Sequence, residues 1–502
     1  MRSLPLAVFG ISSFASLTGA LDVDTELNIT LPPIHKYFST CQAIAKNVSG
    51  VYYPAHPLYI KGNRHWASSS DHPSVCVVEP SNASDVSAIL QIVAKTSTPF
   101  GIRSGGHATN PGFSSTPGVQ IALFKLSEVT YHAGPVSADG SVGTVDVGSG
   151  LIWDDVYAAL EPYNVTVVGG RATGIGVGGF TLGGGYSWLS NQYGLTIDTV
   201  VAFEVVLPNG TVTTATNTTN PNLFFGLKGG FNNFGIVTKF TLLAYPQTQV
   251  WGGVLTYNEH LSDVNAATVD FIANVTDPKA AIIMSPYISP LNLLQPGMSL
   301  LMFYDGPNPR AGIFERFTSI ANASSDVSTR SMTNFVRANP ANGTAGFRTA
   351  FNTISLETYS NSLLDLVLNQ TMYWGQKAAL QGGLLISYSV EPFLRSYSAK
   401  SKGGAYPHDN FLTPLNLDWS WVAEPSDNFF ISAAKESAQT ILDQAVAEGQ
   451  DVAGAKQIKY GNYAAADEDL ISLYGSNLKG LRIIKQRYDP NNVMGLAGGY
   501  RL

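Results

Sequence analysis

Charged residues are scarce in this chain of 502 residues, since Asp, Glu, Lys and Arg make up only 13% of it, about half the share of an average soluble protein. There is also no basic excess, because 29 Lys and Arg face 36 Asp and Glu and the formal net charge is −7. Nucleic acids and anionic membranes are bound by basic surfaces. The composition therefore argues against both as partners, whereas a hydrophobic share of 44% suffices for one large core or two ordinary ones.

Metal-binding motifs and cysteine clusters are absent. The chain has no HExxH motif, and His56 and His65 lie in a loop region without ligand spacing. We therefore expect no metal site. In an oxidising compartment the only two cysteines, Cys41 and Cys76, are expected to form one disulfide, worth about 3–4 kcal/mol on the chain-entropy model. Two separate buried thiols are the alternative.

Long apolar runs are absent apart from one at the N-terminus. There, Met1 and Arg2 precede a mostly apolar run from Leu4 to Leu17, and small residues follow up to Ala20. This pattern predicts a secretory signal peptide over residues 1–20. A retained membrane anchor is the alternative, but the run is shorter than the roughly 20 apolar residues of a span. We expect a secreted protein without a membrane span.

Asn-X-Ser/Thr sequences are numerous and fit passage through a eukaryotic secretory pathway. The candidate glycosylation sites are Asn28, Asn47, Asn82, Asn164, Asn209, Asn217, Asn274, Asn322, Asn342 and Asn369.

The sequence Arg103-Ser104-Gly105-Gly106-His107 is the first motif that points to chemistry. An amphipathic helix is predicted over Asp85–Ala94 and a short strand over Pro99–Arg103, so the glycines follow the end of a strand. Two adjacent glycines let the backbone approach a phosphate closely and form an anion-binding nest. The histidine that follows is placed to reach a bound cofactor. An ordinary surface turn is the alternative.

A glycine-rich tract occupies residues 174–185 and contains the pattern GxGxxG, with Asp198 about 20 residues beyond it. That combination is the usual signature of NAD binding. However, the tract is too rich in glycine to continue into the helix of a Rossmann unit, because each glycine costs roughly 1 kcal/mol relative to alanine. This tract suits backbone that packs directly against a pyrophosphate better than a Rossmann helix.

Several further segments recur in the same order as in a known family. They are Pro73–Pro80, Gly169-Gly170, Asn220–Gly230, Asn232–Val237, Tyr460–Tyr463 and Arg487–Asn491. Together with the two glycine motifs they resemble the vanillyl-alcohol-oxidase-type flavoproteins with a PCMH-type FAD domain. Within that group, the chain is most similar to the berberine-bridge-enzyme and 6-hydroxynicotine-oxidase branch, over nearly the whole length after residue 20.

The resemblance implies an α+β fold with an antiparallel substrate sheet inserted into a two-part FAD-binding domain. The boundaries expected are 1–20 for the signal peptide, 21–74 for a segment that packs on the FAD domain, 75–246 for the FAD domain, 247–455 for the substrate domain and 456–502 for a berberine-bridge-like return to the FAD domain. The sequence itself predicts a hairpin at Asn209-Gly210. It also predicts strands at Thr144–Val147, Thr166–Val168, Val200–Leu207, Ile236–Leu243, Trp251–Tyr257, Ile282–Ile288 and Met298–Tyr304, and helices at Asp263–Asn274 and Ser432–Ala447.

The resemblance also implies FAD as cofactor, covalently joined through a ring nitrogen of His107. A non-covalent histidine beside the pyrophosphate is the alternative. The expected cofactor-binding residues are Arg103, Ser104, Gly105, Gly106, His107, Gly112, Gly174, Gly176, Gly178, Gly179, Gly184, Ile236, Val237 and Asn462. Ala172 stands where doubly tethered relatives have a cysteine, so a single tether is expected. Double tethering is typical of the family's oligosaccharide oxidases, and its absence favours a smaller, more enclosed substrate.

Oxidation by a flavin needs a base that takes a proton from the substrate. Asp418 and Tyr460 are the leading candidates, and His408 is a third, although plain packing is the alternative for each. The tryptophans Trp188, Trp374, Trp419 and Trp421 either line a cavity for a planar substrate or form core, and core is the commoner role.

These observations predict an FAD-dependent oxidase that removes two electrons from a small alcohol, amine, phenol or polyketide and passes them to O₂. Ile175 is bulkier than the valine on the oxygen side of the ring in relatives, so a dehydrogenase with another acceptor stays open. A carbohydrate oxidase is the rival enzyme, and a flavin-carrying binding protein without turnover is the rival from a different class. The sequence gives no indication of the oligomeric state.

Overall fold

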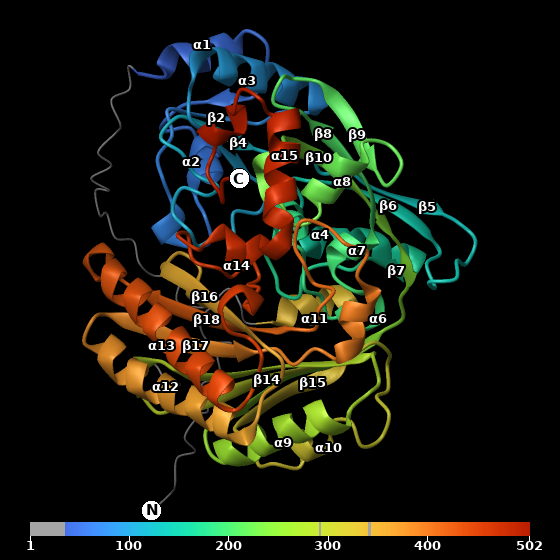
Figure 1. The fold of residues 1–502 in the computed structure, drawn as a ribbon, viewed down its shortest axis with the longest axis vertical. Helices are drawn as coiled ribbons and strands as arrows, with labels where there is room; N and C mark the ends of the chain where they lie inside the picture. Colours follow the sequence, from blue (N-terminus) through green and yellow to red (C-terminus); the bar gives the residue numbers. More distant parts are fainter. Residues whose placement is uncertain (1–35, 291–292, 340–342) are drawn as a thin grey trace, which may run out of the picture.

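The computed structural model describes residues 36–290, 293–339 and 343–502. The expected signal peptide, Asn28 and Asn342 lie outside the described residues. Figure 1 shows two layered parts. The upper part is built from the first half of the chain together with its C-terminal end, and the lower part from the yellow-green to orange segments between. Helices and antiparallel sheets are mixed throughout, which confirms the α+β class.

The first sheet of the upper part carries the strand that precedes the His107 loop. Its order is β1-β2-β4-β3, and the pairs β2–β4 and β4–β3 are parallel. The strands are β1 Val51–Tyr52, β2 Cys76–Val78, β3 Phe100–Arg103 and β4 Val119–Ala122. Helix α3 (Ala83–Thr96) crosses over between β2 and β3, and the Asn82 side chain caps it by accepting from the Asp85 amide at 3.0 Å. The helix and strand predicted here are confirmed.

The second sheet of the upper part is antiparallel, with the order β5-β6-β10-β8-β9. Its strands are β5 Val129–Ala133, β6 Gly143–Gly148, β8 Val200–Val206, β9 Val212–Thr216 and β10 Ile236–Leu243. The predicted Asn209-Gly210 hairpin is confirmed, because Val206 pairs with Val212 and Gly210 takes φ +88°. A two-strand ribbon of β7 (Val165–Thr166) and β11 (Tyr245–Pro246) lies beside it.

Short helices connect these strands and complete the upper part. They are α2 Pro57–Asn63, α4 Trp153–Leu160, α5 Val177–Leu182, α6 Ser190–Tyr193, α7 Thr196–Thr199 and α8 Pro221–Leu227. At the C-terminal end, α14 (Leu470–Tyr474) and α15 (Leu478–Tyr488) return to this part. Lys485 of α15 donates to the Asn233 carbonyl at 3.0 Å, and Asn233 donates to the Tyr500 carbonyl at 2.9 Å.

The lower part is a seven-stranded antiparallel sheet with the order β15-β12-β14-β13-β17-β18-β16. Its strands are β12 Val250–Tyr257, β13 Ala280–Ile288, β14 Gly297–Tyr304, β15 Ser324–Arg330, β16 Arg348–Leu356, β17 Gly383–Val390 and β18 Thr413–Trp421. The side chains of β13 alternate, since Ile282 and Met284 belong to the core under the helices while Ile283 and Ser285 face a cavity. One face of the sheet is therefore core and the other faces the cavity.

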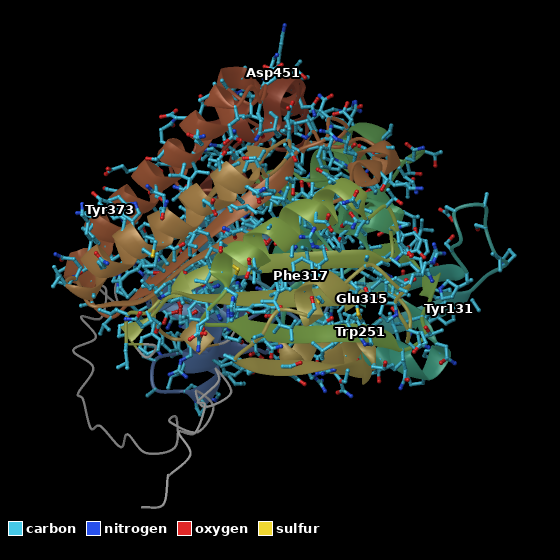
Figure 2. All side chains as sticks on the ribbon, turned by 90° about the horizontal axis from the view of Figure 1, so that it is seen from below. Tyr131, Trp251, Glu315, Phe317, Tyr373 and Asp451 are labelled. Carbon is cyan, nitrogen blue, oxygen red and sulfur yellow. A yellow bond between two sulfur atoms is a disulfide. The ribbon has the colours of Figure 1, made fainter. Side chains whose placement is uncertain are left out.

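Helices cover the core face of this sheet. They are α9 Leu261–Asn274, α10 Glu315–Thr318, α12 Asn361–Ala379 and α13 Asp427–Ala447, and α11 (Met332–Ala338) lies nearer the upper part. Figure 2 shows Tyr373 on the outer side of α12, where its side chain is 46% exposed. Among the described helices none is long and apolar enough to cross a membrane.

The two cysteines form the expected disulfide. Cys41 on α1 (Phe38–Ala45) is bonded to Cys76 at the start of β2, with the Cα atoms 6.2 Å apart. Both residues are fully buried in the core under α3. The bond therefore fastens the first described helix to the sheet that carries the His107 loop.

Candidate active site

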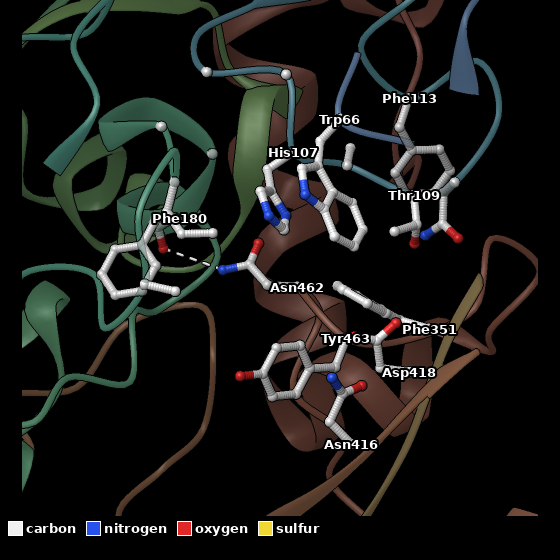
Figure 3. A pocket seen from close by; sticks show the side chains of 18 of the residues that line it. Trp66, His107, Thr109, Phe113, Phe180, Phe351, Asn416, Asp418, Asn462 and Tyr463 are labelled. Carbon is white, nitrogen blue, oxygen red and sulfur yellow. Dashed lines mark hydrogen bonds between the residues drawn. The ribbon is translucent and has the colours of Figure 1, made fainter. Parts of the chain in front are cut away.

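A cavity of about 1090 Å³ lies between the glycine segments of the upper part and the open face of the seven-stranded sheet. Three separate stretches of the chain form its wall: the upper part before Pro246, the sheet, and residues 460–463 with 499–500 of the C-terminal return. Figure 3 shows Asp418, His107 and Tyr463, one from each stretch, around the same space. The cavity is thus assembled only when all three stretches are in place.

The loop after β3 and the glycine tract are locked together on the upper wall. The Ser104 hydroxyl donates to the Ser149 carbonyl at 2.6 Å and accepts from the Gly178 amide at 3.1 Å. A Cβ atom on Gly105 would lie only 2.5 Å from the Gly176 nitrogen, so both backbones need glycine at this crossing. A Cβ on Gly179 would meet nothing within 4 Å. The locked backbone therefore leaves room for a ligand directly against it.

The glycine tract does not form a Rossmann unit. Helix α5 begins after Gly176 and ends at Leu182, only six residues long, and Gly184 and Gly185 follow with φ +128° and +87°. Asp198 accepts from the Leu195 and Lys402 amides at 2.8 Å and lies 2.9 Å from the ring of His408. Neither Asp198 nor His408 lines the cavity. Asp198, whose spacing suggested NAD binding, and His408, the third candidate base, are thus buried partners of each other.

Most of the predicted cofactor residues line the cavity. Those that do are Ser104, Gly105, Gly106, His107, Gly176, Gly178, Gly179, Ile236, Val237 and Asn462, and those that do not are Arg103, Gly112, Gly174 and Gly184. Arg103 turns away, because its guanidinium donates to the Lys61 carbonyl and lies 4.9 Å from the ring centroid of Phe124. The three glycines take φ between +78° and +128°, so they shape the loops around the cavity instead.

His107 is held flat against an aromatic ring. Its imidazole stacks on the indole of Trp66 with centroids 4.3 Å apart and an angle of 16°, and the Trp66 amide donates to the Gly106 carbonyl at 2.8 Å. Burial lowers the pKa of His107 to about 4, so the ring is neutral at physiological pH. Its Nε2 atom has no hydrogen-bond partner in the described part of the chain. The ring is thus oriented, uncharged and free to bond.

Asp418 projects from β18 into the cavity (Figure 3). Its Oδ1 atom is buried without a hydrogen-bond partner among the described residues, and burial raises the pKa of the carboxyl to about 7. Tyr460 also lines the cavity, but its hydroxyl accepts from the Gly185 amide at 3.1 Å and from Asn462 at 2.7 Å. Of the two predicted catalytic residues, Asp418 is the one with an unengaged proton acceptor.

Comparison with known sequences shows the family to which the chain belongs. A family model described as "FAD binding domain" matches residues 74–216, and one described as "Berberine and berberine like" matches residues 459–497. The FAD-dependent monooxygenase drtC of Aspergillus calidoustus is 34% identical over 465 residues, which are 88% of this chain and 86% of that protein. The chain belongs to this family of FAD-dependent oxidoreductases. An uncharacterized FAD-linked oxidoreductase of Arthroderma benhamiae is 35% identical over 378 residues, covering 72% and 73% of the two chains.

Solved structures of the berberine-bridge type share the fold of this FAD-dependent oxidoreductase. BBE-like 1 of Physcomitrella patens superposes with a TM-score of 0.72 at 19% identity, over 90% of this chain and 97% of its own. The 6-hydroxy-D-nicotine oxidase of Arthrobacter nicotinovorans gives 0.72 at 17% identity, over 90% and 98%. The glucooligosaccharide oxidase of Acremonium strictum, described with a 6-S-cysteinyl, 8α-N1-histidyl FAD, gives 0.72 at 18% identity, over 91% and 97%. The expected fold family is therefore confirmed.

The residues of the cavity fit an FAD. The crossing at Gly105 and Gly176, with open space above Gly179, is a backbone cradle of the kind a pyrophosphate or flat ring needs. His107 offers an unpaired, neutral ring nitrogen to the same space. Ala172 and Ile175 also line the cavity, and no thiol is near because both cysteines are in the disulfide. Among the described residues of this FAD-dependent oxidoreductase, one histidine and no cysteine therefore line the cavity.

Sequence reasoning missed a buried cluster that joins all three walls. Arg171 of the upper part lies 2.8 Å from a carboxylate oxygen of Glu391, which directly follows β17, and donates to the Tyr463 hydroxyl at 2.7 Å. Tyr463 in turn donates to Glu391 at 3.0 Å. Only Tyr463 belonged to a recognised motif. No spacing in the sequence connects residues 171, 391 and 463, so a single sequence contains no signal for this contact.

The tryptophans chosen as cavity candidates are core residues. Trp188, Trp374, Trp419 and Trp421 are at most 4% exposed, and none of them lines the cavity. The aromatic residues that do line it include Trp66, Phe113, Phe180, Phe351 and Tyr287. The commoner expectation, core packing, is the one the structure bears out.

Proposed function

We propose that this protein is a secreted FAD-linked oxidase that removes two electrons from a small uncharged molecule carrying an alcohol, amine or phenol group. One observation carries the proposal: an oriented neutral imidazole, His107, and an unpaired carboxyl, Asp418, line the same cavity from different walls. The first suits attachment of the cofactor and the second suits proton transfer from a substrate.

The attachment runs through His107 alone. A covalent bond from the ring to FAD needs a nitrogen with a free lone pair, and burial keeps this imidazole unprotonated because it lowers the pKa to about 4. The Trp66 stack fixes the plane of the ring before the cofactor arrives. Ala172 provides no thiol for a second bond, which supports a single tether.

Asp418 acts as the base. A flavin held in this cavity supplies an acceptor for the substrate hydride and its two electrons. The proton of the substrate O–H or N–H goes to Asp418, whose pKa of about 7 lies close to the operating pH that makes a general base most effective. The sheet fixes this carboxyl rigidly, because β18 is paired on both sides with β16 and β17.

Three alternatives concern the fate of oxygen, the size of the substrate and the electron acceptor. The relatives named FAD-dependent monooxygenases, in Aspergillus calidoustus and Cochliobolus heterostrophus, favour insertion of an oxygen atom as the second candidate. The oligosaccharide oxidases among the fold neighbours favour a carbohydrate, but Ala172 supports the smaller substrate. Ile175 on the cavity wall makes a dehydrogenase the further alternative to the use of O₂.

Secretion is supported by the surface of the molecule. All eight candidate glycosylation sites within the described residues have exposed asparagines: Asn47, Asn82, Asn164, Asn209, Asn217, Asn274, Asn322 and Asn369. A glycosyltransferase can therefore reach each of them, and the Cys41–Cys76 disulfide is the bond expected of an oxidising compartment.

Acid precipitation of the purified protein followed by peptide mapping tests the attachment. The yellow colour should stay with the pellet, and only the peptide that contains His107 should carry the mass of FAD. Free FAD in the supernatant would contradict the covalent bond. Turnover of a panel of small alcohols, amines and phenols under ¹⁸O₂ then separates the candidates, since an oxidase releases labelled H₂O₂ and a monooxygenase labels its product.

A further inference from the structure

The cavity face of the seven-stranded sheet carries a row of small polar side chains. Ser299 on β14 pairs with Ser285 on β13, and Ser389 on β17 pairs with Asn416 on β18. The hydroxyl of Ser285 donates to that of Ser389 at 3.3 Å, which joins the two halves of the row. All four side chains line the cavity. We call Ser285, Ser299, Ser389 and Asn416 the polar strip.

Part of the polar strip lacks a partner. The Ser299 hydroxyl and the Oδ1 atom of Asn416 are buried without a hydrogen bond among the described residues. Native proteins pair nearly all such atoms, because burial without a partner is unfavourable. The two atoms lie on strands near opposite ends of the row and face the same space. Three strand spacings, roughly 14 Å, separate them, so a small ring reaches one of them at a time, and the Asn416 end is the one beside Asp418.

Apolar side chains lie on both sides of the polar strip. Leu301 and Ile283 pair with each other on one side of it. On the other side Tyr287, Leu385 and Phe351 line the cavity together with the polar Ser387 and Asp418. A ligand that covers this surface therefore needs an apolar body and a polar edge. Neighbouring strands lie about 4.8 Å apart, which is close to the separation of oxygen substituents on alternate carbons of a flat six-membered ring.

The charges around the strip exclude an anion. The charged side chains that line the described cavity wall are Arg171, Glu391 and Asp418. The charge of Arg171 is offset by Glu391, whose carboxylate oxygen lies 2.8 Å from it, and the same guanidinium nitrogen donates to Tyr463 at 2.7 Å. Asp418 lies two residues from Asn416 on the same strand face and repels a carboxylate when it is ionised.

We propose that the Ser389–Asn416 end of the polar strip selects an uncharged ring with hydrogen-bonding oxygens on alternate carbons, and rejects the same ring when it carries a carboxylate. This inference rests on the proposed function, because it names the substrate class of that site. Asn416 and Ser389 act as specificity-determining residues at the end of the strip nearest Asp418. The apolar borders contact the faces of the ring.

Binding to the flavin-carrying protein tests this inference without turnover. The probes are methyl 3,5-dihydroxybenzoate, the matching acid 3,5-dihydroxybenzoate, and methyl 3-hydroxybenzoate, which lacks one oxygen. Dissociation constants are measured by titration calorimetry at pH 8 under nitrogen. We expect the dihydroxy ester to bind at least tenfold more tightly than its acid, and more tightly than the monohydroxy ester.

Variants assign the effect to the strip. Asn416→Leu and, separately, Ser389→Ala should weaken binding of the dihydroxy ester about tenfold while changing the monohydroxy ester less than threefold. Ser325→Ala on the edge strand β15, an exposed serine of the same sheet, is the matched control and should change neither. Ser389→Ala removes a single hydroxyl, so it carries the test if Asn416→Leu does not fold.

Three results would overturn the inference: equal or tighter binding of the acid, no measurable binding of the dihydroxy ester, or an effect of Ser389→Ala no larger than that of the control. They leave the proposed function intact if the protein still carries FAD on His107. Purified protein without any flavin would instead contradict the proposed function itself.

Discussion

At the scale of single residues, Asp418 is the position where burial and chemistry are most closely linked. Asp418→Asn keeps the size of the side chain and removes the proton acceptor. We expect kcat/KM to fall by about 10²–10⁴-fold, the usual contribution of a general base, while the content of covalent FAD stays unchanged. In the wild type, kcat/KM should rise with pH around a midpoint near 7. Steady-state kinetics between pH 5 and 9 checks both expectations.

The same substitution should alter how stability depends on pH. Because burial raises the pKa of Asp418 from 3.8 to about 7, the folded protein keeps this proton where the unfolded chain has lost it. The stability that the proton contributes is complete below about pH 4 and is lost as the pH rises through 7. Asp418→Asn should match the wild type at pH 4 and exceed it at pH 8 by up to about 4 kcal/mol. Parallel denaturant titrations with the same difference at both pH values would contradict a desolvated carboxyl.

Trp66 should control how readily the cofactor becomes attached. The indole holds the His107 ring at 4.3 Å, nearly parallel, so it restricts the ring to one plane. We expect Trp66→Ala to lower the fraction of covalently bound FAD severalfold, and Trp66→Phe to restore most of it because a flat ring returns. Absorbance after acid precipitation measures this fraction. A normal fraction in Trp66→Ala would show that the glycine loops orient His107 by themselves.

At the scale of elements, the ion pair of Arg171 and Glu391 links the upper part to the sheet. Arg171→Met would leave Glu391 buried without its cation, which typically costs about 3–5 kcal/mol. The double variant Arg171→Met/Glu391→Leu removes both charges and should recover much of that loss. Denaturant unfolding of the two single variants and the double variant measures the coupling. If the double variant is no more stable than Arg171→Met, the loss of stability in Arg171→Met does not come from an unpaired Glu391 carboxylate.

The elements that sequence reasoning predicted are those with strong local signals. Helix α3 has an asparagine cap and a buried stripe, and the β8–β9 hairpin has Asn209-Gly210 at its turn. The strands β12, β13 and β14 have apolar runs bounded by turns. Local chemistry decides each of these, so the chain alone suffices to place them within a few residues.

The elements and contacts that could not be predicted depend on distant parts of the chain. The order β15-β12-β14-β13-β17-β18-β16 is set by packing across the whole sheet rather than by any one strand. The same is true of the site. His107 and Asp418 stand in recognisable segments, but the pairing of Asp198 with His408 and the Trp66 stack become visible only in three dimensions. Asp198 is the clearest case, because its spacing suggested a ribose contact and its carboxylate instead caps α7.

At the scale of the whole molecule, the cavity depends on three stretches of chain, and the disulfide secures only one of them. Cys41 and Cys76 close a loop of 35 residues within the upper part, and neither residue lines the cavity. The bond should therefore act on the stability of the fold and leave the chemistry of the cavity unchanged. Removing the disulfide therefore tests whether the stability of the fold and the chemistry of the cavity are independent.

The double variant Cys41→Ser/Cys76→Ser should lose about 3–4 kcal/mol of stability on the chain-entropy model. Thermal unfolding and secretion yield should both fall, because more of the chain is unfolded at any moment and is removed during export. The covalent FAD per folded molecule should stay at the wild-type level, since the bond joins α1 to β2 and not to the loop that carries His107. The double variant is compared with Ser325→Ala, which alters a surface hydroxyl and no crosslink. A folded fraction that lacks covalent FAD would show that the crosslink also positions the loop after β3, and would place the disulfide within the apparatus that holds the cofactor.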